Sequence, residues 1–427
     1  MILLKKCNLV SLDESLNQIE YGIDVLIDED RIVQIGKDIK IKKEKVKVID
    51  CLNKYVLPGL INCHTHIPMS LFREIVDGYA LQDWLEKAIW PIENKMNDED
   101  IYNFTKLSLL ECLHDGVCFI NDMYFKDDII IKAMNKIGVD GITTCTLMDI
   151  DGEEKGNERL VNFKKLVIEH PNNKFSLSLH GFYTCSEEYI KKCIELAKEL
   201  DIKLVHVHFC ENKKEVETIK ERYQVKNPTD ILIKYFKDFK LILAHCVELS
   251  AKDITNLKTL DCSVVHNPIS NLRLGCGIAK IEEMVKNGIN VCLGTDGQGS
   301  GSNLSILKSA SFASLLQKGA KKDPTIMKSY DVLKMGTINA AKALCIENDY
   351  GSVSVGKKAN IFIMDFNNIQ MFPVNDAISD IIFNSQSGDI EYVIINGKIV
   401  MKEGKHVDIK KNKLIKKCSE RLIELKK

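Results

Sequence analysis

Two histidines separated by one residue are the first side chains whose spacing could do chemistry. His64 and His66 end an apolar run that follows a Pro-Gly turn at residues 58–59. Successive side chains on a β-strand point to opposite faces, so a strand here would place both imidazoles on one side. Two neutral imidazoles on one face are half of a zinc-type site, although ordinary strand-end histidines show the same spacing. Further ligands must come from elsewhere in the chain.

Short apolar runs recur along the chain and predict the elements that could position such ligands. Eight runs rich in Ile, Val, Leu and Cys are expected to form strands, at residues 60–63, 118–121, 142–147, 175–179, 204–209, 241–244, 262–265 and 290–293. Amphipathic stretches separate them, such as residues 98–113, with Asn97 as candidate N-cap and Gly116 beyond the end. Eight alternating units favour an α/β fold with a closed (β/α)8 TIM-type barrel over an open doubly wound sheet.

The active site of such a barrel lies at the C-terminal ends of its strands, where this chain concentrates its histidines. Besides His64 and His66, the strand-end residues are His180, His206, His208, His245, His266 and Asp296. His208 lies nearer the strand end than His206, so we assign the metal to His208 and a structural role to His206. Asp296 lies in a Gly-Thr-Asp-Gly segment whose glycines let the backbone approach a ligand. Three imidazoles and one carboxylate around a divalent ion leave room for a water with a lowered pKa.

Hydrolysis by such a water also needs groups that move protons. Glu211, three residues beyond His208, could protonate a ring nitrogen of a substrate while the water attacks the adjacent carbon. His245 could orient the water or stabilise developing negative charge, and Asp296 could carry the water's proton to the leaving group. His180 occupies the end of strand four, where a two-metal site would need a carbamylated lysine, so we expect one metal ion.

The composition bounds the class of protein around this site. The 427 residues leave room for an accessory domain beside a barrel of about 250 residues. A formal net charge of −1 gives no reason to expect nucleic acid or a membrane as partner, which favours a small molecule. Fifteen cysteines without a secretory signal favour the reducing cytoplasm, and no apolar run approaches the ~20 residues of a membrane span. The sequence does not decide whether the protein forms a homo-oligomer.

Both ends of the chain predict β structure instead. Residues 23–27 and 31–35 flank an acidic turn as a hairpin would, and residues 359–365 and 392–402 repeat this style, with an Asn-Gly turn in the last segment. We expect a small β-sandwich domain from residues 1–56 and 352–407, a catalytic barrel over residues 57–351 and a C-terminal amphipathic helix over residues 408–427. The apolar side of that helix is expected to hold Leu414, Ile415, Cys418, Leu422 and Ile423.

Longer motifs spread over nearly the whole chain. They are PGLINCHTHIPMSLFR (58–73), DWLEKAIWPIE (83–93), HVHFCE (206–211), AHCVEL (244–249), HNPISNLRLGCGIA (266–279), GTDGQGSGS (294–302) and MFPV (371–374). Together they resemble the amidohydrolase superfamily, specifically its 5′-methylthioadenosine/S-adenosylhomocysteine deaminases. The resemblance implies deamination of adenine nucleosides, with one divalent ion, Zn²⁺ or Fe²⁺, on His64, His66, His208 and Asp296. It also implies that Glu93, His180 and Glu211 bind the nucleoside, with Glu93 on the ribose hydroxyls.

Two further segments bear on the substrate. Trp84 and Trp90 lie in the loop after strand one and could form an apolar lid over a purine, or simply pack in the core. Members of the family often carry two arginines for the charged tail of S-adenosylhomocysteine. Here Cys145 stands at the position that matches the first, and Arg159 resembles the second. With one cation instead of two, we expect methylthioadenosine or adenosine to be preferred over S-adenosylhomocysteine.

Two alternatives remain. Another aromatic-ring hydrolase of this superfamily, such as a guanine deaminase or a triazine chlorohydrolase, would leave Glu93 and Arg159 without a ribosyl partner. A non-catalytic scaffold would not need the complete ligand set or Glu211. Metal analysis and an ammonia-release screen separate these possibilities.

Overall fold

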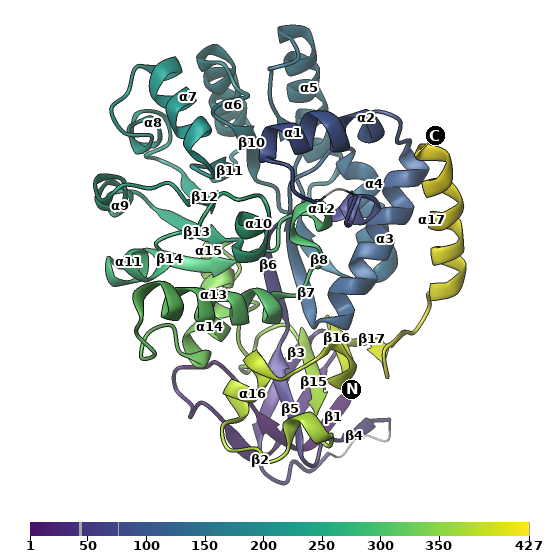
Figure 1. Ribbon diagram of the computed structural model, residues 1–427. Helices are drawn as coiled ribbons and strands as arrows, with labels where there is room; N and C mark the ends of the chain where they lie inside the picture. Colours follow the sequence, from purple (N-terminus) through teal and green to yellow (C-terminus); the bar gives the residue numbers. More distant parts are fainter. Residues whose placement is uncertain (42–44, 76, 427) are drawn as a thin grey trace.

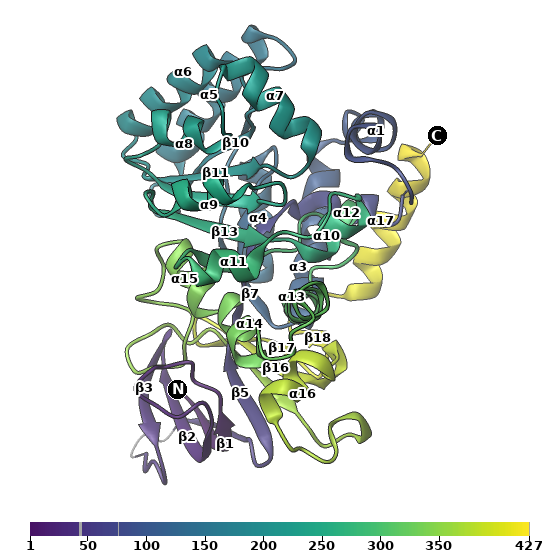
Figure 2. The same cartoon turned by 60° about the vertical axis from the view of Figure 1, so that its left-hand side comes forward.

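The computed structural model of the chain describes residues 1–41, 45–75 and 77–426. Its fold is α/β, with two sheets of parallel strands and a mixed sheet built from both ends of the chain (Figure 1). Figure 2 shows the mixed sheet at the bottom of the molecule, apart from the helices that surround the parallel strands. Among the described residues, no helix has the length and apolar character needed to cross a membrane.

The parallel strands pair in the order β6–β7–β8 in one sheet and β9–β10–β11–β12–β13–β14 in the other. They are β6 Leu60–Thr65, β7 Val117–Asp122, β8 Asp140–Ile142, β9 Thr146–Leu147, β10 Leu177–Gly181, β11 Leu204–Phe209, β12 Lys240–His245, β13 Cys262–His266 and β14 Asn290–Leu293. Every residue of β6, β7 and β11 is buried, as near-continuous apolar runs in parallel sheets predict. The expected strand positions are confirmed, apart from the third.

The prediction of one continuous strand over residues 142–147 was wrong. The chain forms two short strands, β8 and β9, and between them Thr143 makes only an isolated bridge with Phe175. The buried hydroxyl of Thr144 donates to the carbonyl of Ser176. Side-chain bonds to a neighbouring backbone compete with regular pairing, and a pattern of apolar residues does not reveal them.

The two parallel sheets approach each other at the ends of β6 and β14. The N–H groups of Thr295 and Asp296 both donate to the carbonyl of His64, at 3.1 and 3.0 Å. On the other side, a parallel bridge joins Tyr124, beyond β7, to Cys145, just before β9. The C-terminal ends of strands from both sheets therefore face one region.

Helices follow the parallel strands and surround them (Figure 1). They are α3 Asp98–His114, α4 Asp127–Ile137, α5 Glu153–Glu169, α6 Glu187–Glu199, α7 Lys213–Tyr223, α8 Thr229–Tyr235, α9 Ala251–Leu257, α10 Pro268–Arg273, α11 Ile281–Lys286, α12 Gln298–Gly301, α13 Ile306–Lys321, α14 Ser329–Met335 and α15 Ile338–Ala343. The predicted cap of α3 is confirmed, because Asn97 Oδ1 accepts from the Asp100 N–H at 3.0 Å and Asp100 Oδ2 accepts from the Asn97 N–H at 2.9 Å. Such a cap stabilises a helix by about 1 kcal/mol.

The strands from the two ends of the chain form one nine-stranded sheet. They are β1 Ile2–Leu9, β2 Glu20–Asp28, β3 Arg31–Gly36, β4 Lys47–Asp50, β5 Lys54–Pro58, β15 Ile361–Asp365, β16 Ile390–Ile395, β17 Lys398–Lys402 and β18 Lys405–His406. Antiparallel pairing of β5 with β15 joins the two sets, and the expected hairpins β2–β3 and β16–β17 are confirmed. At the Asn-Gly turn, a Cβ on Gly397 would lie 1.7 Å from the Glu29 carbonyl oxygen, so only glycine fits there. Three short helices complete this end: η3 Ile369–Met371, α16 Ala377–Phe383 and η4 Ser387–Asp389.

The tail forms helix α17 Lys411–Leu425, which lies beside α3 at the edge of the molecule (Figure 1). Leu414 and Cys418 are buried, but Ile415 and Ile423 are 42% and 61% exposed. The prediction that these two isoleucines share the buried side was therefore wrong. The helix contacts α3 along a narrow apolar stripe. Beyond this stripe, the Arg421 guanidinium donates to Asp100 Oδ1 of α3 at 2.8 Å. Lys427, the last residue of the expected helix, lies outside the described residues.

Candidate active site

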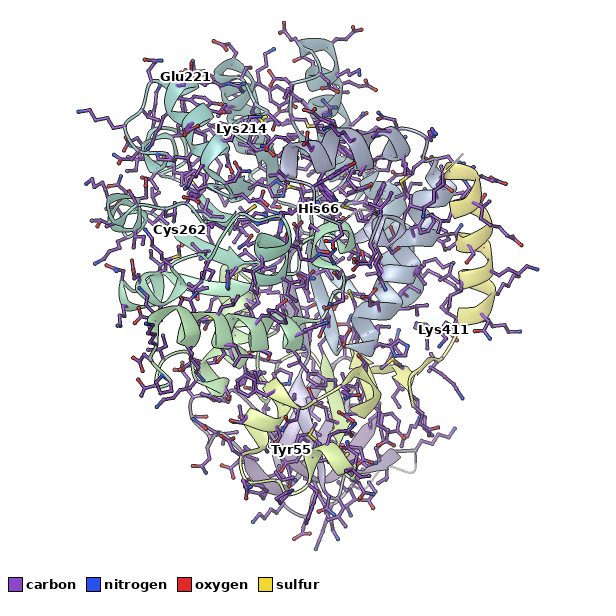
Figure 3. All side chains as sticks on the ribbon, in the orientation of Figure 1. Tyr55, His66, Lys214, Glu221, Cys262 and Lys411 are labelled. Atoms are coloured by element: carbon purple, nitrogen blue, oxygen red, sulfur yellow. The ribbon has the colours of Figure 1, made fainter. Side chains whose placement is uncertain are left out.

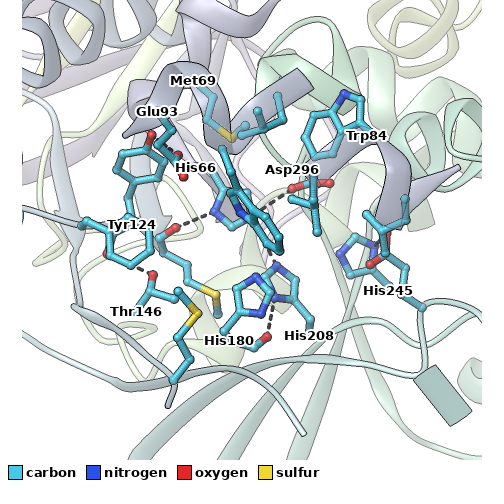
Figure 4. Close-up of a pocket in the computed structure, with 18 of the residues that line it drawn as sticks. His66, Met69, Trp84, Glu93, Tyr124, Thr146, His180, His208, His245 and Asp296 are labelled. Carbon is cyan, nitrogen blue, oxygen red and sulfur yellow. Dashed lines mark hydrogen bonds and ion pairs between the residues drawn. The ribbon is translucent and has the colours of Figure 1, made fainter. Parts of the chain in front are cut away.

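Ionisable side chains from four strand ends converge in the middle of the molecule. Figure 3 shows His66 there, far from peripheral residues such as Lys411. His66 Nε2 lies 3.1 Å from Asp296 Oδ1 and 3.3 Å from His208 Nε2, and His64 Nε2 lies 3.6 Å from the same Asp296 oxygen. One ligand atom each from His64, His208, His245 and Asp296 also fall within 4.8 Å of one another. These five residues form what we call the His–Asp cluster, of which Figure 4 labels His66, His208, His245 and Asp296.

Hydrogen bonds orient the imidazoles of this cluster. His66 Nδ1 donates to the Met123 carbonyl and His208 Nδ1 to the His180 carbonyl, both at 2.5 Å, so Nε2 is the ring nitrogen that each histidine presents to the cluster. Carbonyl contacts of this kind orient metal-binding histidines in general. His64 Nδ1 lies 2.9 Å from His206 Nε2. The opposite nitrogen, His64 Nε2, is buried without a hydrogen-bond partner among the described residues and faces the cluster.

Three neighbours hold the carboxylate of Asp296. The hydroxyls of Ser270 and Ser300 donate to Oδ2 at 2.6 and 2.7 Å, and the Gly297 N–H donates to Oδ1 at 2.8 Å. Asp296 itself has a left-handed backbone, with φ +62°. Oδ1 therefore faces the imidazoles, while the serines occupy the other oxygen. Sequence reasoning missed both serines, although they lie in the motifs HNPISN and GQGS.

Burial is the main influence on the pKa values in this cluster. It lowers the pKa of His64 to about 3 and that of His180 to about 4, so both are neutral at pH 7. Burial opposes ionisation of Asp296 too, but the neighbouring imidazoles of His64 and His66 hold its pKa well below the usual range. Burial also lowers the pKa of His66, but the contact with the Asp296 carboxylate has the larger effect and raises this pKa to about 9. A divalent ion competes with that proton for the same nitrogen.

Glu211 and His245 lie side by side at the edge of the cluster. Their nearest atoms, Glu211 Oε1 and His245 Nδ1, are 3.6 Å apart, and His245 Nδ1 also lies 2.8 Å from Asn271 Oδ1. Burial raises the pKa of Glu211. The carboxylate of Glu215 accepts from the Cys210 and Glu211 N–H groups at 2.9 and 2.7 Å, which fixes the turn that aims Glu211 inward. Sequence reasoning missed Glu215 and Asn271, because neither follows a strand directly.

A cavity that is partly open to solvent lies next to the cluster. It is lined by His66, Met69, Leu81, Trp84, Leu85, Ile89, Trp90, Glu93, Met123, Tyr124, Phe125, Thr146, Met148, His180, Tyr183, His208, Glu211, His245 and Asp296. The helical elements α1 Leu81–Trp84, η2 Leu85–Ile89 and α2 Trp90–Glu93 supply both tryptophans; the loop before them begins with η1 Ile67–Phe72. A mostly apolar lining with a few polar side chains is typical of a small-molecule site.

Most of the residues expected to bind substrate line this cavity. Trp84 is 6% exposed, and its indole N–H has no hydrogen-bond partner among the described residues. His180 Nδ1 lies 3.1 Å from the Thr184 hydroxyl. Glu93 accepts a hydrogen bond from the hydroxyl of Tyr124, and burial raises the pKa of this carboxyl. Sequence reasoning missed Tyr124, which lies in a loop beyond β7 and carries no motif of its own.

Arg159 departs from the sequence expectation, because it lies outside the lining of this cavity. Its guanidinium donates to both carboxylate oxygens of Asp151, at 2.6 and 2.7 Å, and to the Met148 carbonyl at 2.8 Å. It lines a neighbouring depression together with Cys145. The structure therefore brings Arg159 and Cys145 together, but away from the His–Asp cluster.

Comparison with known proteins relates this site to a family. The model of the amidohydrolase family matches residues 55–400. The chain belongs to the amidohydrolase family. The 5-methylthioadenosine/S-adenosylhomocysteine deaminase of Thermoanaerobacter pseudethanolicus is 39% identical, with 96% of each chain covered. The 5′-deoxyadenosine deaminase of Methanocaldococcus jannaschii is 36% identical over 93% of this chain and 95% of its own.

Among solved structures, a zinc-bound adenosine deaminase from Xanthomonas campestris superimposes with a TM-score of 0.93, covering 100% of this chain and 98% of its own. At 24% identity this likeness concerns the fold. The resemblance to methylthioadenosine/S-adenosylhomocysteine deaminases, inferred from the motifs, is confirmed by the sequence relatives.

As an amidohydrolase, the chain is a hydrolase, and its His–Asp cluster fits a divalent metal ion. The buried, unpartnered His64 Nε2 marks a position where a ligand is missing from the hydrogen-bond network. Imidazole nitrogens and a carboxylate oxygen around one point are the donors that such ions take in catalytic sites. Neutral His64 and ionised Asp296 are in the protonation states that metal binding requires.

Proposed function

We propose that this amidohydrolase is a metal-dependent deaminase that converts adenine nucleosides into the inosine analogues and ammonia. The observation that carries the proposal is a single cavity that connects the His–Asp cluster and Glu211 with Glu93. Relatives named for methylthioadenosine, S-adenosylhomocysteine and 5′-deoxyadenosine support an adenine nucleoside as substrate.

One divalent ion, Zn²⁺ or Fe²⁺, would be held by His64, His66, His208 and Asp296. His66 is the fourth ligand in preference to His245, because its Nε2 lies 3.1 Å from the Asp296 oxygen and 3.3 Å from His208 Nε2. His245 instead lies against Glu211, which suits a role in the chemistry. The zinc in the Xanthomonas relative's structure supports zinc over iron.

The chemistry that such an ion supplies is the activation of water for attack on the amino-bearing carbon of the purine. Glu211, whose buried carboxyl has a raised pKa, gives a proton to the adjacent ring nitrogen. Asp296 takes one proton from the water and passes it to the amine, which departs as ammonia, and Glu211 takes back the second water proton as the carbonyl forms. His245, oriented by Asn271, donates to the oxygen on which negative charge develops.

The rest of the cavity binds the nucleoside. Trp84 packs against the purine, which suits an indole that contributes a large apolar face to the wall. His180, neutral at pH 7, offers a hydrogen bond to the base or the sugar. Glu93 accepts hydrogen bonds from the ribose hydroxyls, because a carboxylate presents two acceptor oxygens to two adjacent donors.

The 5′ tail of the preferred substrate is uncharged. The cation that the resemblance assigns to a carboxylate tail, Arg159, is engaged by both oxygens of Asp151, and Cys145 beside it carries no charge to add. Methylthioadenosine and adenosine are therefore better substrates than S-adenosylhomocysteine, whose zwitterionic tail needs a partner when it leaves water.

The architecture extends this proposal. The two parallel sheets form one closed (β/α)8 barrel over residues 57–351, supported by the bonds of Thr295 and Asp296 to the His64 carbonyl. Residues 1–56 and 352–407 form a β-sandwich accessory domain, supported by one apolar cluster shared by β1, β2, β3, β5, β15 and β16. The cytoplasmic location stays a prediction from the sequence, which leaves the oligomeric state open.

An ammonia-release screen of the metal-loaded protein tests the function. The screen covers adenosine, methylthioadenosine, 5′-deoxyadenosine, S-adenosylhomocysteine, guanine, adenine and a chlorotriazine, the last followed by chloride release. We expect turnover of the adenine nucleosides, with S-adenosylhomocysteine roughly 10- to 100-fold lower in kcat/KM, the effect of one missing charge-assisted contact. Turnover of guanine or the triazine alone would replace the proposal with one of those activities.

A further inference from the structure

A hydrogen bond between Tyr124 and Glu93 crosses the cavity wall. Glu93 is the last residue of α2 and of the helical segment 81–93. Tyr124 lies in the loop that follows β7. The tyrosine hydroxyl donates to Glu93 Oε1. Among the described residues, the Glu93 side chain makes no other hydrogen bond. Figure 4 shows both residues on the left of the cavity, with His245 on the right. The pair therefore lies at the end of the cavity away from Glu211 and His245.

The two partners differ in how firmly the fold holds them. Tyr124 is 3% exposed, and its carbonyl accepts from both the N–H and the hydroxyl of Thr146, each at 2.9 Å. Its ring packs beside Phe125, with centroids 5.5 Å apart. By contrast, no residue of α2 is buried over its whole surface, although the Glu93 carboxyl at its end turns into the cavity and is shielded from solvent there. A glutamate on such a helix keeps several rotamers open unless a neighbour selects one.

We propose that Tyr124 is a positioning residue for sugar recognition: it holds the Glu93 carboxylate in the orientation that receives two vicinal hydroxyls. This rests on the proposed function, because it assumes a ribosyl substrate. A carboxylate has about four acceptor positions, and Tyr124 takes one of them, which leaves acceptors on both oxygens. A carboxylate that is fixed before the substrate arrives loses less rotamer freedom on binding. The resulting gain in affinity applies to substrates that carry both hydroxyls.

The test compares adenosine with 2′,3′-dideoxyadenosine as substrates of the metal-loaded, full-length protein. We expect wild type to favour adenosine in kcat/KM by about 10- to 100-fold, through hydrogen bonds to a charged acceptor. Tyr124→Phe keeps the ring and removes the donor. Its KM for adenosine should rise about 3- to 10-fold with kcat within about 2-fold, and kcat/KM for the dideoxy substrate should stay within about 2-fold of wild type.

A double-mutant cycle makes the role of the pair measurable. Glu93→Gln alone should also shrink the preference for adenosine, and adding Tyr124→Phe to it should change the preference no further. Tyr189→Phe is the matched control. Tyr189 is 2% exposed, its hydroxyl donates to the Gly156 carbonyl at 3.0 Å, and it does not line the cavity. That variant should keep both the wild-type preference and the wild-type KM.

Each outcome bears on one proposal only. An equal rise in KM for both substrates would mean that Tyr124 merely anchors segment 81–93, and an unchanged preference in Tyr124→Phe would mean that Glu93 needs no positioning. Either result overturns the inference while the deaminase activity stands. If Tyr124→Phe loses metal or thermal stability, Glu93→Gln decides instead, since an undiminished preference there also overturns the inference. Wild-type protein that releases no ammonia from any adenine nucleoside would refute the proposed function itself.

Discussion

The His–Asp cluster and the helical segment 81–93 line the same cavity, but the fold holds them in different ways. His64 and His208 lie on strands in which every residue is buried, His66 directly follows the first of these strands, and neighbouring carbonyls or imidazoles fix the three rings. Segment 81–93 is a succession of short α- and π-helical turns with several exposed residues. The comparison indicates a rigid reaction centre opposite a substrate-binding wall that depends on few contacts. Changes in the first should act on metal and kcat, and changes in the second on KM.

The largest effect is expected from His208→Ala. Loss of this strand-borne ligand leaves the ion one donor short, so bound metal and activity should fall together, with kcat lower by ~10³-fold or more. Elemental analysis of the purified variant and of wild type checks the result. We expect one ion per chain in wild type. A variant that keeps full metal occupancy would show that His245 completes the set instead.

Glu211→Gln should come next. The amide keeps the shape of the side chain but gives up no proton, so kcat should fall by on the order of 10²-fold or more while the metal content stays that of wild type. The exposed Glu221→Gln on α7 is the matched control and should behave as wild type. Turnover near the wild-type rate in Glu211→Gln would assign proton transfer to another group.

Trp84→Leu probes the opposite wall and should have a smaller effect of another kind. A shorter apolar side chain preserves burial but loses contact with an aromatic ring, so KM for adenosine should rise roughly 2- to 10-fold with little change in kcat. Steady-state kinetics with adenosine separate the two parameters. A drop in kcat with unchanged KM would contradict the division between the two walls, because it would make Trp84 part of the reaction centre.

Arg159→Ala should give the smallest effect. The guanidinium is already bound to Asp151 and lies outside the cavity, so kcat/KM for adenosine should stay within about 2-fold of wild type. For S-adenosylhomocysteine we expect a decrease of no more than a few-fold. A decrease of about 100-fold for that substrate alone would indicate that Arg159 leaves Asp151 to bind the tail.

Several features follow from local pattern and were predictable. The buried strands β11 and β14 lie where their apolar runs begin and end, and Asn97 caps α3 as its position suggests. Strand alternation also predicted that His64 and His66 lie on one side; β6 ends at Thr65, but the centroids of the two rings are 5.0 Å apart. Local pattern failed where a side chain altered the backbone, as Thr144 does between β8 and β9.

The sequence by itself therefore determined which residues stand at the ends of the parallel strands, because strand period and strand burial are local properties. The metal, catalytic and nucleoside-binding roles assigned to those residues stay predictions until the variants above are measured. Only the tertiary structure decided which further side chains meet around the site: Tyr124 with Glu93, Ser270 and Ser300 with Asp296, and Arg159 with Asp151. Those contacts join segments far apart in the chain or lie in loops without a repeating period, so their geometry depends on how the elements pack against one another.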